Sequence, residues 1–305
     1  MSIEIRKAES KEFLRRKKIF KKIFSVRCFD SEMEKTNWKA VRRLGNIAYQ
    51  LKAKEDDVEF TIDKIDDVEC LITKPNNIKN NNVIYYIHGG GFVAGGVRGS
   101  KSFCSMLASY SGSVVVACEY GLAPEHPFPE GFNDCFKVYE NIIEKYDAIS
   151  VVGDSAGGNL ALGVTLKAKE KNIKKPSCVI LHSPVVDLSL SFEKNTDVDD
   201  FIVKISCVEP LKKMYCGNTE KLKTYELSPI LGDFEGMPPL FITCAANEML
   251  RNDSENLYKK AIENHIEAKL IIMENAYHDY GTIGVKSPET KQIFLETIDF
   301  INKNT

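Results

Sequence analysis

The chain has 305 residues, a length that allows one large domain or two small ones. Hydrophobic residues make up 43% and charged residues 28%, which are ordinary values for a globular protein with a core. The mean hydropathy of -0.23 and the absence of an apolar run of about 18 residues argue against a membrane-spanning protein. The first residues contain neither an apolar stretch nor a small-residue cleavage site, so we expect no secretory signal.

Cysteine usage points to a reducing compartment. The nine cysteines are odd in number, scattered along the chain and without a C-x-x-C pair. This pattern predicts neither a disulfide framework nor a zinc site. We therefore expect a reduced, cytoplasmic protein without a metal.

The net charge of -2 hides an asymmetry between the N-terminal segment and the rest of the chain. Residues 1–27 carry ten Lys and Arg against three Glu, a balance of +7, and the remaining residues sum to -9. A basic body that binds nucleic acid is therefore excluded, although a basic N-terminal arm is not. We expect no nucleic-acid partner.

Residues 11–24 show the pattern of an amphipathic helix. One side of this helix carries five apolar side chains, namely Phe13, Ile19, Phe20, Ile23 and Phe24. Such a basic helix is able to lie on an anionic membrane surface. Packing against its own protein explains the same pattern without the second signal that stable anchoring needs, so we expect no membrane contact.

From about residue 56 the pattern changes to strands that alternate with helices. Short apolar runs predict strands at 58–62, 68–72, 83–87, 114–117, 150–152, 179–181, 240–244 and 270–273. Helices are expected at 101–110, 131–145, 157–171, 253–264 and 288–302, the last with Ser287 as N-cap. This alternation predicts an α/β domain over 56–305 with a mostly parallel sheet flanked by helices.

The interval 185–235 interrupts this rhythm. A structureless loop of that length is uncommon inside a compact domain, so we expect an inserted helical segment there. Together with a helical N-terminal segment at 1–55, the insertion is expected to form a lid.

Gly153-Asp154-Ser155-Ala156-Gly157 lies between a predicted strand and a predicted helix, which is the context that gives a G-x-S-x-G motif its meaning. The small residues allow a sharp turn that exposes the Ser155 hydroxyl at a helix N-terminus. A free serine is a poor nucleophile and needs a base to take its proton. The motif therefore predicts a catalytic serine, with an ordinary turn as the alternative.

A second motif, His88-Gly89-Gly90-Gly91-Phe92, follows directly on the strand at 83–87. Consecutive glycines let backbone N–H groups point into a cavity without obstruction by Cβ. Such donors are able to stabilise the oxyanion that forms when a serine attacks an acyl carbonyl. Together the two motifs predict nucleophilic acyl chemistry.

The base is sought among five histidines. His182 and His278 each follow a predicted strand, whereas His88 belongs to the glycine loop. The chain order serine, acid, histidine of an α/β-hydrolase selects His278, and His182 remains the competitor. The acid is then expected just beyond the strand at 240–244, where Glu248 lies.

A carboxylate at Glu248 would hold the imidazole tautomer and stabilise the imidazolium. Asp253 is the alternative acid, although its position favours the N-cap of the helix at 253–264. We expect Glu248 in the catalytic role.

Three stretches of the chain resemble the hormone-sensitive-lipase group of α/β-hydrolase esterases. They are His88 to Phe92, Gly153 to Asn159, and Tyr120 to Pro129, and the resemblance runs from about residue 60 to the end. It implies oxyanion donors from the backbone of Gly89, Gly90 and Ala156, with Ser155, Glu248 and His278 as the triad. It also implies a cap built from the N-terminal segment and residues 185–225.

The chain departs from this group at three points. The group usually has Asp-Tyr-Arg where this chain has Glu119-Tyr120-Gly121, which removes a guanidinium that would brace a loop. The triad acid is often Asp, and here Glu248 stands in its place. The sequence of the cap matches no pattern, so the substrate stays open.

These features predict a serine esterase that needs no cofactor and acts on small acyl esters, short chains being preferred by resemblance. An amidase or peptidase is able to use the same residues. A non-catalytic receptor for a small ligand on the same fold is the alternative from another class, and the presence of all three triad residues argues against it. A homodimer is compatible with the sequence.

Overall fold

The computed structural model describes residues 1–24, 30–50, 54–196, 198, 200–217 and 219–305. Within these ranges the strands form one sheet in the order β1-β9-β8-β7-β6-β4-β5-β3-β2. The strands are β1 (Ser2–Lys7), β2 (Val58–Ile65), β3 (Val68–Pro75), β4 (Asn82–Ile87), β5 (Val114–Cys118), β6 (Ala148–Asp154), β7 (Cys178–His182), β8 (Leu240–Ala245) and β9 (Ala268–Glu274). Strand β3 is antiparallel to both of its neighbours, and the other pairings are parallel, which confirms the predicted mostly parallel sheet.

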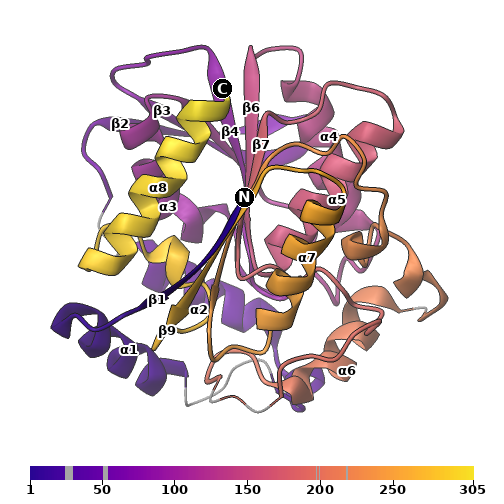
Figure 1. The fold of residues 1–305 in the computed structure, drawn as a ribbon. Coiled ribbons are helices and arrows are strands. Elements are labelled where there is room, and N and C mark those ends of the chain that lie inside the picture. The colour runs from indigo at the N-terminus through magenta and orange to yellow at the C-terminus, as the bar shows by residue number, and fades with distance from the viewer. Residues whose placement is uncertain (25–29, 51–53, 197, 199, 218) are drawn as a thin grey trace.

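Helices cover both faces of the sheet. Figure 1 shows α3 and α8 on one face, and α4, α5 and α7 on the other. Their bounds are α3 (Val97–Ser111), α4 (Glu130–Ile142), α5 (Ala156–Glu170), α7 (Arg251–Glu263) and α8 (Pro288–Asn304). The central strands are buried on both sides, which explains why they are continuous apolar runs in the sequence. Ser287 caps α8 as predicted, because its hydroxyl accepts a hydrogen bond from the Thr290 N–H.

The segment 1–55 is not helical throughout, because residues 2–7 form β1 at the edge of the sheet. Strand β1 pairs in parallel with β9, from Ser2 opposite Lys269 to Lys7 opposite Glu274. Its exposed face carries Ile3 and Ile5, and its other face carries the polar Ser2, Glu4 and Arg6. Residues 2–6 alternate between polar and apolar side chains, a pattern that indicates a strand, although the apolar residues face outward here.

Helix α1 (Lys11–Phe24) has the predicted bounds and packs on the loop that follows β9. Phe13 is almost fully buried, and its ring lies 5.5 Å from that of Tyr277 and 6.5 Å from that of Tyr280. Phe20 stacks on Tyr277 at 5.3 Å. Ile19, in contrast, is about half exposed, and the side chains of residues 23 and 24 lie outside the described ones.

The insertion consists of short helical turns within irregular chain. They are Ile205–Cys207, α6 (Val208–Leu211), Lys212–Cys216 and Thr219–Lys223. Figure 1 shows α6 at the same end of the sheet as α1 and α2 (Trp38–Gln50). The division of the chain at residue 55 and the role of residues 185–225 as a cap stay predictions.

Eight cysteines of the described ranges are free and buried, and Cys28 lies outside those ranges. Burial raises the pKa of several of these thiols, among them Cys104 and Cys178, so they stay protonated near neutral pH. Among the described residues, no cluster of His, Cys, Asp and Glu is arranged to hold a metal ion. A search of the same residues finds no helix with both the length and the apolarity needed to cross a bilayer.

Replacing Phe13 by alanine is expected to lower the free energy of unfolding by about 3 kcal/mol, since a buried aromatic ring that contacts two others is lost. Urea unfolding measures this change. Leu14→Ala is the matched control, because Leu14 is the next residue of α1 and 37% exposed, and it should cost less than about 1 kcal/mol. Equal losses in the two variants would contradict the packing of α1 through Phe13.

Candidate active site

Ser155 lies at a sharp turn between β6 and α5. Its backbone has φ 51° and ψ -117°, a conformation that non-glycine residues rarely adopt. The turn is held by its neighbours: the Ser155 N–H donates to the His182 carbonyl at 2.8 Å, and the Val185 N–H donates to the Ser155 carbonyl at 3.0 Å. The side chain is thereby aimed away from the sheet at the N-terminus of a helix.

Close backbone approach explains the glycines that flank this turn. A Cβ on Gly153 would lie 2.4 Å from the Gly157 carbonyl oxygen, and a Cβ on Gly157 would lie 2.1 Å from the Ile87 carbonyl oxygen. Neither distance is tolerable, so α5 approaches the ends of β4 and β6 only when both positions are glycine. The G-x-S-x-G spacing is therefore a packing requirement here, as well as a turn.

His278 lies within hydrogen-bond distance of both other predicted triad residues. Its Nε2 is 2.9 Å from Ser155 Oγ, and its Nδ1 is 3.2 Å from Glu248 Oε2. The three side chains come from the turns after β6, β8 and β9, which are brought together by the parallel sheet. All three are at least nine-tenths buried. The structure thus places the three predicted triad residues in one consecutive series of hydrogen-bond contacts, from Glu248 through His278 to Ser155.

Glu248 is held by two partners on the same oxygen. Besides His278, the Ser183 hydroxyl donates to Glu248 Oε2 at 2.9 Å. Burial raises the pKa of Glu248, and the hydrogen bond from His278 opposes that rise. The carboxylate therefore depends on His278 for its charge, and His278 depends on the carboxylate for its orientation.

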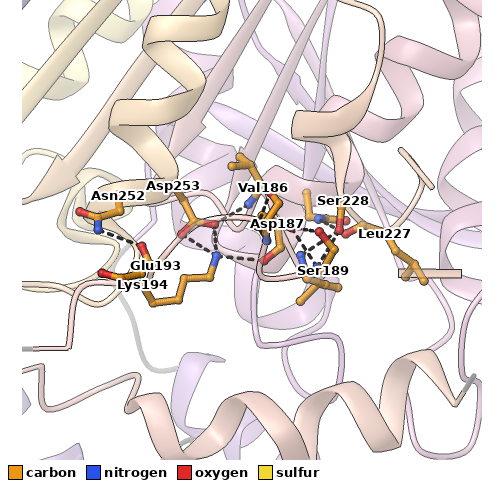
Figure 2. Close-up of polar contacts among 12 residues, drawn as sticks. Val186, Asp187, Ser189, Glu193, Lys194, Leu227, Ser228, Asn252 and Asp253 are labelled. Carbon is orange, nitrogen blue, oxygen red and sulfur yellow. Dashed lines mark hydrogen bonds and ion pairs between the residues drawn. The ribbon is translucent and has the colours of Figure 1, made fainter. Parts of the chain in front are cut away.

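Asp253, the alternative acid, points away from the line of Ser155, His278 and Glu248. Both of its carboxyl oxygens lie 2.7 Å from Lys194 Nζ, and Oδ1 also accepts the Val186 N–H at 2.9 Å, as Figure 2 shows. Lys194 and Asp253 are both buried. The prediction of Asp253 as an N-cap is wrong, because α7 begins at Arg251 and Asp253 lies in its first turn. From there its ion pair with Lys194 connects α7 to the start of the insertion.

His182, the competing base, is a core histidine. Its Nδ1 lies 2.8 Å from Thr243 Oγ1, and its ring meets Phe103 edge-on. Burial lowers its pKa to about 4, so it stays neutral at physiological pH. Its contribution to the turn comes from its backbone carbonyl, which accepts the Ser155 N–H.

The glycine loop after β4 is braced by rings. His88 Nδ1 lies 2.8 Å from the Gly89 carbonyl oxygen, and the His88 ring stacks on Tyr120 at 4.4 Å. The Tyr120 hydroxyl donates to the His88 carbonyl at 2.8 Å. The loop therefore rests on Tyr120, a residue that the sequence analysis names only within a family motif.

The predicted oxyanion donors lie in two adjacent segments. Gly89 and Gly90 belong to the loop after β4, and Ala156 begins α5, where the first N–H groups have no acceptor within the helix. Gly90 has φ 119°, and a Cβ there would lie 2.3 Å from the Ala94 carbonyl oxygen. The oxyanion role of these three residues stays a prediction.

Asp154 is a buried carboxyl between Ser155 and the glycine loop. Its Oδ1 accepts a hydrogen bond from the Tyr86 hydroxyl at 2.6 Å. Burial and the negative charge of Asp279 raise the pKa of Asp154 to about 7. In the sequence Asp154 is only the first variable position of the G-x-S-x-G motif, and nothing there indicates its burial or its partners.

The loop at Glu119-Tyr120-Gly121 lacks the Arg that the esterase group usually has there. Arg42 of α2 supplies a guanidinium to this region instead. Its Nε donates to the Val93 carbonyl at 2.7 Å, and its Nη2 donates to the Ala123 carbonyl at 2.6 Å and to Glu125 Oε2 at 2.8 Å. Gly121 has no room for a side chain, since a Cβ there would lie 2.9 Å from that of His126. A residue some 80 positions away thus braces this loop, and no local motif could have indicated it.

Replacing Asp253 by asparagine is expected to lower the free energy of unfolding by about 3 to 5 kcal/mol, because the buried Lys194 ammonium loses its ion-pair partner and keeps only the charge of Asp187 nearby. Chemical denaturation measures the loss. The double variant Asp253→Asn, Lys194→Met should recover part of it, and Asn252→Ala, which removes one neutral hydrogen bond to the Glu193 carbonyl at a half-buried neighbouring position, should cost only about 1 kcal/mol. A double variant no more stable than Asp253→Asn alone would contradict this account.

Replacing Arg42 by methionine is expected to lower the free energy of unfolding by about 2 kcal/mol. The carbonyl groups of Val93 and Ala123 and the carboxylate of Glu125 each lose a charged hydrogen-bond donor in this variant. Thermal unfolding of Arg43→Met, at the exposed neighbour on the same helix, serves as the control. A loss no larger than that of the control would mean that Arg42 does not brace the loops.

The comparisons with known proteins agree with this architecture. The family model of the alpha/beta hydrolase fold matches residues 84–282. An esterase of Acinetobacter venetianus is 30% identical over 223 residues, 72% of this chain and 74% of its own. The carboxylesterase NlhH of Mycobacterium tuberculosis is 31% identical over 218 residues, 67% of each chain.

A solved structure of a hormone-sensitive lipase from a metagenome library is similar with a TM-score of 0.83 and 26% identity, covering 94% of this chain and 98% of its own. The family model spans well over half of the residues and includes the loop after β4, Ser155 and His278. The chain therefore belongs to the alpha/beta hydrolase fold family, and within it is similar to the hormone-sensitive-lipase group.

Proposed function

We propose that the protein is a serine ester hydrolase that acts on short-chain acyl esters through Ser155, His278 and Glu248. The observation that carries the proposal is the position of His278, whose two ring nitrogens lie 2.9 Å from Ser155 Oγ and 3.2 Å from Glu248 Oε2. The relatives named esterase and carboxylesterase support the ester as the bond that is cleaved.

In the first half of the reaction His278 Nε2 takes the Ser155 proton while Oγ attacks the ester carbonyl. The carbonyl π electrons move onto oxygen, where N–H groups of Gly89, Gly90 and Ala156 stabilise the charge. When this tetrahedral intermediate collapses, the C–O bond to the alcohol breaks and His278 gives the alcohol its proton. An acyl-enzyme on Ser155 remains.

In the second half the same histidine takes a proton from water, and the resulting nucleophile attacks the acyl carbonyl. The bond to Ser155 Oγ then breaks, Oγ recovers the proton from His278, and the carboxylic acid is released. Glu248 holds the imidazolium at Nδ1 during both halves without taking its proton. No further reactant than water is required.

The preference for short acyl groups is supported by the resemblance. Phe92 of the glycine loop and Tyr215 of the insertion are both almost fully buried and stack with ring centroids 3.9 Å apart, so the insertion packs directly on the loop. An amide substrate would meet the same residues, so the names of the relatives, rather than the geometry, favour an ester.

Hydrolysis of p-nitrophenyl esters from acetyl to dodecanoyl tests the proposal. The wild type should be fastest on the shortest esters, and Ser155→Ala should lower kcat by about 10⁶-fold because the nucleophile is gone. Glu248→Gln should cost at least about 10³-fold, while Asp253→Asn should retain most of its activity wherever it is folded. Absence of activity on every ester would overturn the function, and activity that survives in Ser155→Ala would overturn the site.

A further inference from the structure

The residue after the catalytic histidine, Asp279, is tied into the polar contacts of the site. Its backbone lies in the left-handed region at φ 59°, which Asp tolerates better than most residues. Its N–H donates to the Ser183 hydroxyl at 3.1 Å, and that hydroxyl donates to Glu248. The backbone of Asp279 is therefore fixed by the same serine that positions the triad acid.

The Asp279 carboxyl faces the reactive side of the histidine. Its Oδ2 lies 3.2 Å from His278 Nε2, the nitrogen that also lies 2.9 Å from Ser155 Oγ. The other oxygen, Oδ1, is buried and has no hydrogen-bond partner among the described residues. His278 thus has a carboxyl group at each ring nitrogen, Glu248 at Nδ1 and Asp279 at Nε2.

The protonation state of His278 decides whether this contact is favourable. In the imidazolium, the Nε2–H is able to donate to both Ser155 Oγ and Asp279 Oδ2. In the neutral base that accepts the Ser155 proton, the Nε2 lone pair faces a negatively charged oxygen at 3.2 Å, which is repulsive. The charged form of Asp279 therefore favours the imidazolium.

The electrostatics of the surrounding groups agree with this geometry. Burial alone would lower the pKa of His278, but the carboxylates of Asp279 and Glu248 outweigh it and raise the pKa well above its ordinary value. The negative charges that face Asp279 from other elements are Glu248, Asp200 in the insertion and Asp154 at the end of β6.

Asp154 is a second buried carboxyl of this cluster whose pKa is raised. Its pKa is raised to about 7 by burial and by the charge of Asp279, and His88 and the Tyr86 hydroxyl beside it only partly oppose that rise. Burial raises the pKa of Asp279 as well, but His278 opposes that rise as a cationic partner. Protonation of Asp154 removes one of the negative charges that oppose ionisation of Asp279.

We propose that Asp279 is a positioning residue that holds the imidazolium form of His278 through Nε2, and so shifts the onset of activity to higher pH while it stabilises the imidazolium formed during catalysis. The inference rests on the proposed function, since it concerns the same site. It assigns the base two carboxylates with different tasks: Glu248 orients the ring, and Asp279 sets the pH at which the ring becomes a base.

The pH dependence of kcat/KM in Asp279→Asn tests the inference. Asparagine keeps the size and the left-handed backbone and removes the charge. The acid limb of the profile should move to lower pH by about 1 to 3 units, the effect expected of one opposite charge in contact. The plateau at high pH should fall, because a base of lower pKa accepts the Ser155 proton less readily.

Glu274→Gln is the matched control. Glu274 is the last residue of β9, four positions before His278, and its side chain is exposed. Its replacement by glutamine removes the same charge without changing a contact of the histidine. Its acid limb should coincide with that of the wild type. A shift as large as that of Asp279→Asn would mean that net charge, and not the contact at Nε2, is responsible, and would overturn the inference.

An NMR titration of the histidine ring separates this inference from the proposed function, because it needs no substrate. The His278 signal is identified by its loss in His278→Asn and followed against pH. A lower midpoint in Asp279→Asn supports the contact even if no ester is hydrolysed, whereas equal midpoints overturn it even if esters are. Where Asp279→Asn does not fold, as judged by thermal unfolding, Asp279→Ser is titrated in its place with the same expectation.

Discussion

The close approach of α5 to the ends of β4 and β6 is the constraint on which the site depends. Without a side chain at Gly153 and Gly157 the helix comes near enough to force Ser155 into its rare backbone conformation. The same approach places the first N–H groups of α5 beside the glycine loop. The predicted nucleophile and the predicted oxyanion donors are therefore positioned by one packing contact, and the strain at Ser155 is maintained by the buried strands around it.

Buried charges in this fold are placed in pairs with separate purposes. Asp253 and Lys194 neutralise one another and hold the insertion to α7, and neither contacts the reactive groups. Glu248 and His278 form the second pair, which is connected to Ser155. Because Asp253 and Glu248 lie within a few residues of each other after β8, only their partners in the folded structure distinguish the carboxylate paired with Lys194 from the one proposed for catalysis.

The sequence predicts those parts of the molecule that local physics dictates. The strands and helices of the sheet follow from apolar runs, and the serine turn follows from its glycines. Arg42, β1 and the contact of Asp279 with His278 depend on segments far apart in the chain or on the direction of one side chain. No motif marks Arg42 or the contact of Asp279 with His278, and the alternation of residues 2–6 indicates a strand without indicating its partner β9, so these contacts become visible only in the folded structure.

The pairing of β1 with β9 has a consequence for how the protein is made. Ser2 is able to pair with Lys269, and Phe13 to pack on Tyr277, only after the residues of β9 and the loop behind it have left the ribosome. Strand β1 and helix α1 thus remain without these native contacts until then, which makes their docking a long-range, late step. The loop that carries His278 packs against α1 in the same late step. The turn at Ser155 is therefore able to form well before the loop of His278 has its native packing.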